Sequence, residues 1–122
     1  MLLLSLTAAL VLVLAAGVAF AVNKMCLHNC RGTGESDRLV GSARDNTIHA
    51  LDGSDRVLGR GGDEIFGQED NDRVKGSFGR NRVYGGPGDD LVRGGTTDQT
   101  NDGALDVLVC GDGSGLISSL GS

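Results

Sequence analysis

The stretch Gly85-Gly86-Pro87-Gly88-Asp89-Asp90-Leu91-Val92-Arg93 decides the fold of this chain. It matches in full the nonapeptide G-G-x-G-x-D-x-U-x, in which U is a large aliphatic residue. On both sides of this block the same pair recurs, an acidic or amide residue followed two positions later by a branched aliphatic residue. Most of these pairs are nine or eight residues apart. The aliphatic members are Leu39, Ile48, Val57, Ile65, Val74, Val83, Val92 and Leu108, and their polar partners are Asp37, Asn46, Asp55, Asp63, Asp72, Asn81, Asp90 and Asp106.

Each block predicts one loop and one very short strand. Glycines permit the positive-φ backbone of a tight turn, and x-U-x predicts a three-residue strand whose central side chain points inward. Such strands are stable only when stacked, and a right-handed coil with two strands per turn pairs each strand with its equivalent two blocks later. The U residues then form two buried columns, Leu39, Val57, Val74 and Val92 in one and Ile48, Ile65, Val83 and Leu108 in the other.

These blocks resemble the RTX, or haemolysin-type calcium-binding, repeat family over roughly residues 32–113. The resemblance implies an all-β fold, a parallel β-roll (right-handed β-solenoid) of about eight degenerate nonapeptide repeats. Most copies depart from the pattern, since Glu35, Arg44 and Asp70 stand where the inner glycine would be. A flexible acidic linker is the alternative for so glycine-rich a segment. The constant phase of the aliphatic residues favours the roll.

The loops predict a calcium site. Stacking brings carboxylates two blocks apart together, and Ca²⁺ accepts six to eight oxygen ligands at about 2.3–2.6 Å, whereas Mg²⁺ demands a tight octahedron. Carboxylates and glycine-turn carbonyls would supply these oxygens. The predicted metal ligands are Asp37, Asp55, Asp72, Asp89, Asp90, Gly53, Gly85, Gly86 and Gly88, with Asp63 and Asn81 as weaker members.

The two loop edges of the predicted roll differ in charge. The loops of the first edge end at Asp37, Asp55, Asp72 and Asp90 and are acidic throughout, whereas the first three loops of the second edge each carry an arginine, namely Arg44, Arg60 and Arg80. Our hypothesis is that calcium fills the first edge, and that arginine and asparagine partly replace it on the second, because a guanidinium satisfies carboxylates and carbonyls without a metal. A solvated face that balances charge is the alternative for these arginines.

The N-terminus predicts a separate element. Residues 2–21 are apolar except for Ser5 and Thr7 and end in Ala19-Phe20-Ala21, a small-x-small pattern expected before a signal-peptidase cut. We expect an apolar helix that is a cleaved secretory signal, or an uncleaved membrane anchor, since the run is long enough to span a bilayer. Both place the repeats outside the cell. The expected organisation is residues 1–21 as signal or anchor, 22–31 as a short cysteine-containing linker, 32–113 as the β-roll and 114–122 as a tail.

Three cysteines in such a chain predict one bridge and one remaining thiol. Cys26 and Cys30 are close enough for a local disulfide. The alternative is a soft-metal site with His28, because the three residues alternate along one short segment. Cys110 is free or pairs between molecules, and the roll is expected to fray or be capped nearby, where Gly115 replaces the ligand Asp.

Charge and motifs argue against two classes of function. The net charge is −5, and arginines that alternate with carboxylates do not predict a nucleic-acid site. The chain has no H-E-x-x-H or G-x-S-x-G motif, so we expect no enzyme. We expect a secreted calcium-binding protein with a cell-surface or matrix component as partner, and a membrane only if the N-terminal segment is uncleaved. The alternatives are a vestigial fragment of a larger RTX enzyme or toxin and a membrane-anchored adhesion protein.

Overall fold

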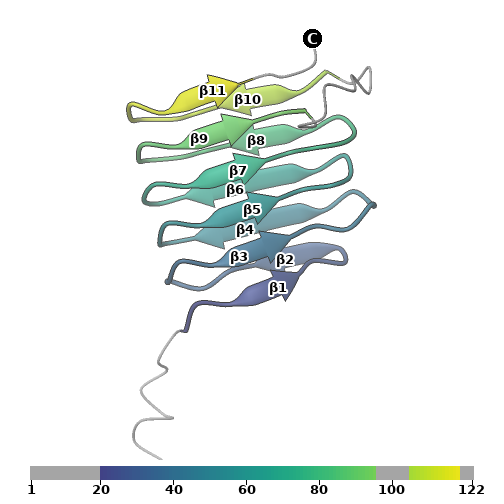
Figure 1. The fold of residues 1–122 in the computed structure, drawn as a ribbon, viewed down its shortest axis with the longest axis horizontal. Coiled ribbons are helices and arrows are strands. Elements are labelled where there is room, and N and C mark those ends of the chain that lie inside the picture. The colour runs from purple at the N-terminus through teal and green to yellow at the C-terminus, as the bar shows by residue number, and fades with distance from the viewer. Residues whose placement is uncertain (1–19, 96–104, 119–122) are drawn as a thin grey trace, which may run out of the picture.

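The computed structural model describes residues 20–95 and 105–118. This part of the chain contains strands and no helix (Figure 1). The strands are β1 (Asn23–Met25), β2 (Asn29–Arg31), β3 (Arg38–Val40), β4 (Thr47–Leu51), β5 (Arg56–Leu58), β6 (Glu64–Gln68), β7 (Arg73–Lys75), β8 (Arg82–Tyr84), β9 (Leu91–Arg93), β10 (Val107–Val109) and β11 (Leu116–Ser118). The predicted apolar helix lies almost wholly outside the described residues. Within those ranges, no helix is long and apolar enough to cross a bilayer.

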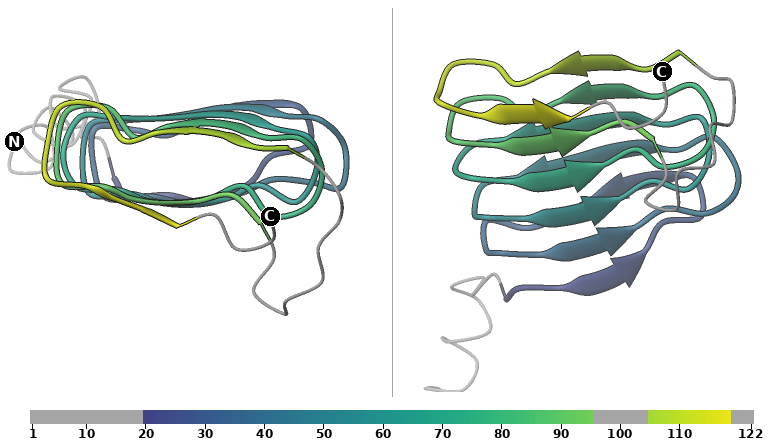
Figure 2. Two further views of the ribbon diagram at one scale, coloured as in Figure 1. Left: turned by 90° about the horizontal axis from the view of Figure 1, so that it is seen from above. Right: turned by 45° about the horizontal axis from the view of Figure 1, so that its top comes forward.

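The strands alternate between two parallel sheets. Sheet A has the order β1-β3-β5-β7-β9-β11, and sheet B has the order β10-β8-β6-β4-β2. Each strand therefore pairs with the strand that follows two positions later in the chain. Seen from above, successive turns lie over one another as a flattened coil with the two sheets face to face (Figure 2). The predicted parallel β-solenoid is confirmed.

The strand register confirms the two predicted columns. In sheet A, Leu39 lies opposite Val57, and Val57 lies opposite Val74. Sheet B aligns its own aliphatic residues in the same way. Because side chains alternate along a strand, the central residue of each three-residue strand points inward. The column members at most 2 % exposed are Leu39, Val57, Val74, Val92, Ile48, Ile65 and Val83, and Leu108 is half-buried.

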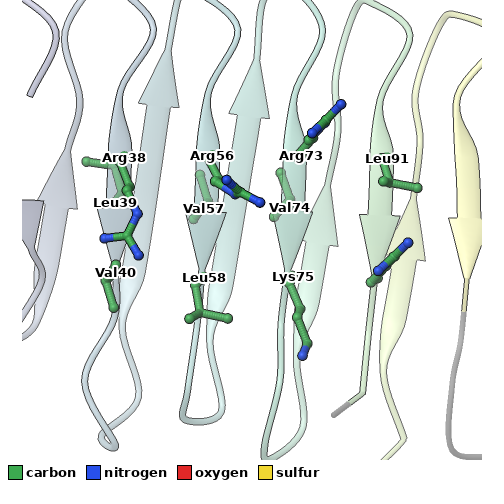
Figure 3. A pocket seen from close by; sticks show the side chains of 11 residues that line it. Arg38, Leu39, Val40, Arg56, Val57, Leu58, Arg73, Val74, Lys75 and Leu91 are labelled. Atoms are coloured by element: carbon green, nitrogen blue, oxygen red, sulfur yellow. The ribbon is translucent and has the colours of Figure 1, made fainter. Parts of the chain in front are cut away.

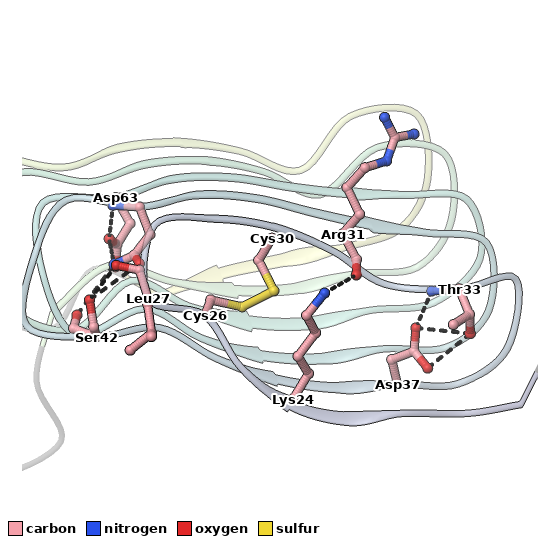
Figure 4. The surroundings of a disulfide bond; sticks show 10 residues. Lys24, Cys26, Leu27, Cys30, Arg31, Thr33, Asp37, Ser42 and Asp63 are labelled. Carbon is pink, nitrogen blue, oxygen red and sulfur yellow. Dashed lines mark hydrogen bonds between the residues drawn. A yellow bond between two sulfur atoms is a disulfide. The ribbon is translucent and has the colours of Figure 1, made fainter.

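The roll extends beyond the predicted repeats at both ends. β1 and β2, in the segment expected to be a linker, pair with β3 and β4. β11, in the expected tail, pairs with β9. Cys30 occupies the U position opposite Ile48, and its disulfide with Cys26 is buried in the first turn (Figure 4). The local disulfide is thus confirmed, and it overturns the soft-metal alternative because both thiols are consumed.

Degenerate blocks keep the turn shape without the glycine. Position two of the block has a positive φ in the full match, 110° at Gly86. The same position holds Leu51 at 87°, Gln68 at 82° and Ser77 at 86°. For a residue with a Cβ, this region costs about 1–2 kcal/mol. The stacked turns therefore impose the loop conformation even where the local sequence opposes it.

Candidate metal centre

The four aspartates of the first edge form a ladder inside the roll. Asp37, Asp55, Asp72 and Asp90 each stand two residues before an inward aliphatic side chain and are at most 3 % exposed. The backbone N–H of Asp37 donates to Oδ1 of Asp55 over 2.7 Å. Asp55 donates in the same way to Asp72 over 2.8 Å, and Asp72 to Asp90 over 2.9 Å. The structure thus brings together the carboxylates that the repeat predicts to be neighbours.

The second oxygen of three of these carboxylates has no partner. Oδ2 of Asp55, Asp72 and Asp90 is buried and accepts no hydrogen bond among the described residues. Asp37 differs, because its Oδ2 accepts from the N–H and the hydroxyl of Thr33 (Figure 4). A buried acceptor without a partner costs about 1–3 kcal/mol, and more when it is charged. The three inner carboxylates therefore need a proton or a cation.

The pKa values of the three inner carboxylates also indicate that each needs a proton or a cation. Burial raises the pKa of Asp72 to about 7, although the N–H of Asp55 lowers it, and the Asp55 and Asp90 carboxylates raise it further. Burial likewise raises the pKa of Asp55 to about 6, against the N–H of Asp37. The pKa of Asp90 is also raised, again chiefly by burial. Near neutral pH the ladder is therefore poised to exchange protons for another positive charge.

In the loops beside the ladder, glycines lie close to backbone carbonyls of the preceding turn. A Cβ at Gly53 would lie 2.8 Å from the carbonyl oxygen of Glu35, and one at Gly88 would lie 2.1 Å from that of Asp70. Only glycine allows loops one turn apart to approach so closely. These predicted ligand positions therefore lie against carbonyl oxygens of the preceding turn.

The glycines that open the blocks leave room for the unpartnered oxygens. A Cβ at Gly67 would lie 2.4 Å from Oδ2 of Asp72, and one at Gly85 would lie 2.3 Å from Oδ2 of Asp90. No group of three His, Cys, Asp or Glu side chains in the described ranges can hold a metal by itself. Carbonyl oxygens must complete any site here. A mixed set of carboxylate and carbonyl oxygens suits Ca²⁺.

Asp89 and Gly86 have different surroundings from the ladder. Asp89 is exposed, and its Oδ1 accepts from the N–H of Ser114 over 2.7 Å. Its own N–H donates to the side chain of Asn71 over 2.7 Å. A Cβ at Gly86 would lie 2.4 Å from the carbonyl oxygen of Gln68. Asp89 and Gly86 therefore connect successive loops at the surface of the first edge.

The second edge repeats the ladder with amide groups. The N–H of Asn46 donates to Oδ1 of Asp63 over 2.8 Å, and the N–H of Asp63 donates to Oδ1 of Asn81 over 3.0 Å. The N–H of Asn81 continues to Oδ1 of Asp106 over 2.9 Å. Oδ2 of Asp63 accepts from the N–H of Gly61 over 3.2 Å. The weaker predicted ligands Asp63 and Asn81 are thus engaged with the protein itself.

On this edge, asparagine amides stand where a cation would be needed. Nδ2 of Asn81 donates to the carbonyls of Phe78 and Gly79 over 3.3 and 3.1 Å. Nδ2 of Asn46 does the same to the carbonyls of Ser42 and Arg44. The asparagine part of the hypothesis fits this geometry. The arginine part does not, because within residues 20–95 and 105–118 the guanidinium groups on this edge donate no hydrogen bond.

A family model for the RTX calcium-binding nonapeptide repeat, in four copies, matches residues 31–63 and 66–98. The chain belongs to this family. The matched residues cover β3 to β9 and both edges of the RTX roll. No curated protein and no solved structure gives a significant match to the chain.

Two features of this RTX roll were missed from the repeat pattern. Thr33 stands four residues before Asp37 and satisfies its free oxygen, as a hydroxyl at position two of a block can do. At the other end, a Cβ at Gly115 would lie 3.0 Å from Sγ of Cys110. The thiol therefore fills space that an aspartate at position 115 would need, and the ladder ends at Asp90. In the sequence, the end of the ladder is marked by a block that has cysteine at its first position and glycine at its sixth.

Proposed function

We propose that this chain binds calcium along the first edge and that the ion stabilises the RTX roll. One observation supports this most directly: among the described residues, the buried Oδ2 atoms of Asp55, Asp72 and Asp90 have no partner, and the three residues follow one another along the ladder. These carboxylates, with Asp37 and the loop carbonyls beside them, would hold the ion. Calcium supplies positive charge and many coordination positions for oxygen.

The proposed role of the ion is structural. A ligand that binds only the folded state adds about 2.7 kcal/mol per site at a hundred times its dissociation constant. Without calcium, the ionised carboxylates of the ladder repel one another in a buried setting. We therefore expect the calcium-free chain to be largely disordered near neutral pH.

We place the protein outside the cell as a non-enzymatic module. The signal-like run at residues 2–21 supports export, and the Cys26–Cys30 disulfide favours an oxidising compartment. Extracellular calcium is abundant, so affinities of about 10⁻⁴–10⁻³ M suffice there. An uncleaved N-terminal anchor would keep the same module on the outer surface. Whether the N-terminus is cleaved is tested by sequencing the N-terminus of the mature protein.

The second edge suggests a sharp test. Asparagine at positions 55 and 72 would keep Oδ1 for the ladder and place an amide where the free oxygen is, as Asn81 does. Asp55→Asn with Asp72→Asn should remove most calcium binding in calorimetry. Asp63→Asn, on the second edge, is the matched control and should retain it. Equal losses from both would contradict the assignment of calcium to the first edge.

A further inference from the structure

The outer face of sheet A carries a basic groove. Arg38, Arg56 and Arg73 lie on β3, β5 and β7 in direct register, at the strand spacing of roughly 4.8 Å. All three side chains are exposed. A second row beside them contains Val40, Leu58 and Lys75 (Figure 3), and the strand register continues it to Arg93. Together the two rows line a groove of about 600 Å³, which we call the arginine groove.

The arginine groove is strongly cationic in an acidic protein. Among the residues that the structure describes, five cationic side chains line the groove and no Asp or Glu does, although the chain has a net charge of −5. In the part of the chain that the structure describes, Arg56 and Arg73 form no ion pair and donate no side-chain hydrogen bond. In the sequence these arginines alternate with aspartates. The fold turns each aspartate inward and the following arginine outward, so that the arginines form a stripe on the outer face of sheet A.

We propose that the arginine groove binds a linear acidic polysaccharide whose carboxylate or sulfate groups repeat along the chain. The planar guanidinium presents paired donors that match such oxyanions, and three of them are set in a line at one spacing. Leu58 and Leu91 add apolar surface between the cations, which suits the C–H faces of sugar rings.

Two other polyanions fit the groove less well. Single-stranded nucleic acids bind through aromatic side chains that stack on bases, and no aromatic residue of the described ranges lines this groove. The aromatic side chains His49, Phe66 and Tyr84 instead stack on one another over sheet B. An anionic bilayer presents a flat surface, whereas the charge here is arranged along a groove. A flexible linear polymer matches this arrangement.

Calcium and the polysaccharide should bind cooperatively. Asp55 and Asp72 directly precede Arg56 and Arg73, so their negative charge lies beside the arginine groove. Neutralising these carboxylates removes repulsion between the protein and a polyanion. This coupling rests on the proposed calcium function, whereas binding in the groove itself does not.

The test uses the full-length chain and a size-defined heparin oligosaccharide, with neutral dextran as the blank. Heparin should bind, and Arg56→Gln with Arg73→Gln should weaken it about tenfold or more, since each arginine contributes charge-assisted hydrogen bonds. The slope of log affinity against log salt should fall by about one per arginine removed. Arg31→Gln with Arg82→Gln, on sheet B, removes the same charge and should change affinity little. Circular dichroism checks that every variant folds.

The outcomes separate this proposal from the calcium proposal. Heparin binding that is lost only in the sheet A variant supports the groove, whether or not calcium changes the fold. Equal losses in both variants, or no binding with and without calcium, overturn it. Tighter binding to duplex DNA or to phosphatidylserine vesicles than to heparin overturns the choice of a polysaccharide. A calcium response without heparin binding supports the calcium proposal and overturns the proposal that the groove binds a polysaccharide.

Discussion

The backbone N–H of Asp55 donates to Oδ1 of Asp72 over 2.8 Å, while Oδ2 of the same carboxylate is buried without a partner among the described residues. One oxygen therefore fixes the register of two turns, and the other is left for a ligand. Folding and binding depend on the same side chain. Its substitution by asparagine separates the two roles, because the amide keeps the acceptor and loses the charge.

Asp55→Asn with Asp72→Asn should make the roll less dependent on calcium. The second edge shows that an amide at this position donates to carbonyls of its own loop, as Nδ2 of Asn81 does to Gly79 over 3.1 Å. Removal of two buried charges should raise the stability of the calcium-free chain by about 1–3 kcal/mol. The folded fraction in a chelator at pH 7.5, followed by far-UV circular dichroism, measures this gain over the largely disordered natural chain. A less stable calcium-free variant would show that the carboxylates stabilise the fold by themselves.

The stability of the calcium-free chain should fall as pH rises. The pKa values of Asp55 and Asp72 are raised by burial from 3.8 to about 6 and about 7. A raised pKa in the folded state contributes stability that is complete below about pH 4 and is lost as pH passes through 6 and 7. In chelator, the chain should therefore show a urea-unfolding transition at pH 5 that is lost by pH 8. An unchanged midpoint over this range would contradict the buried ladder.

Calcium binding should release protons at mildly acidic pH, where protonation of the ladder keeps the calcium-free chain folded. The ladder carboxylates that are protonated in the calcium-free fold must ionise to serve as ligands. Calorimetry at pH 5.5 in two buffers of different ionisation enthalpy should give different apparent binding enthalpies. The difference should persist in Asp63→Asn, which leaves the ladder of the first edge intact. Identical enthalpies in both buffers for the natural chain would mean that these carboxylates are already ionised.

Gln68→Gly should stabilise the roll by about 1 kcal/mol. Gln68 has a φ of 82°, which costs a residue with a Cβ about 1–2 kcal/mol, and its buried Oε1 accepts no hydrogen bond in the described part of the chain. Glycine removes both costs, but it loses more backbone entropy on folding, which offsets part of the stabilisation. Thermal unfolding at saturating calcium measures the change. Thr47→Gly, in an ordinary strand, is the control and should lower the midpoint.

Cys110→Gly with Gly115→Asp should extend the aspartate ladder by one rung. A Cβ at Gly115 would lie 3.1 Å from the N–H nitrogen of Asp90, which is the group that donates to the next carboxylate in the earlier turns. The cysteine must be replaced as well, because its thiol occupies that space. Calorimetry should show additional calcium bound. Gly115→Asp alone is the comparison and should destabilise the last turn through its clash with Cys110.

The sequence predicts the roll and its inner columns because the repeat period acts at short range and places Leu39, Val57 and Val74 in one phase. It also predicts the neighbouring aspartates of the first edge. It does not predict β1 and β2, because that turn lacks the glycines and is closed by a disulfide. The strand pattern also predicts that Arg56 and Arg73 face outward. The free oxygens of the ladder depend on which hydrogen bonds each carboxylate makes, and those bonds become visible only when the turns are stacked.

The most direct test of the calcium proposal is a calcium titration of the full-length chain at pH 7.5, followed by far-UV circular dichroism, with magnesium as the control. We predict a cooperative gain of β structure with calcium and little change with magnesium, because the mixed carboxylate and carbonyl oxygens suit the larger ion. A spectrum that stays the same up to about 10 mM calcium, well above the affinity range of extracellular modules, would contradict calcium as the ion that stabilises this roll.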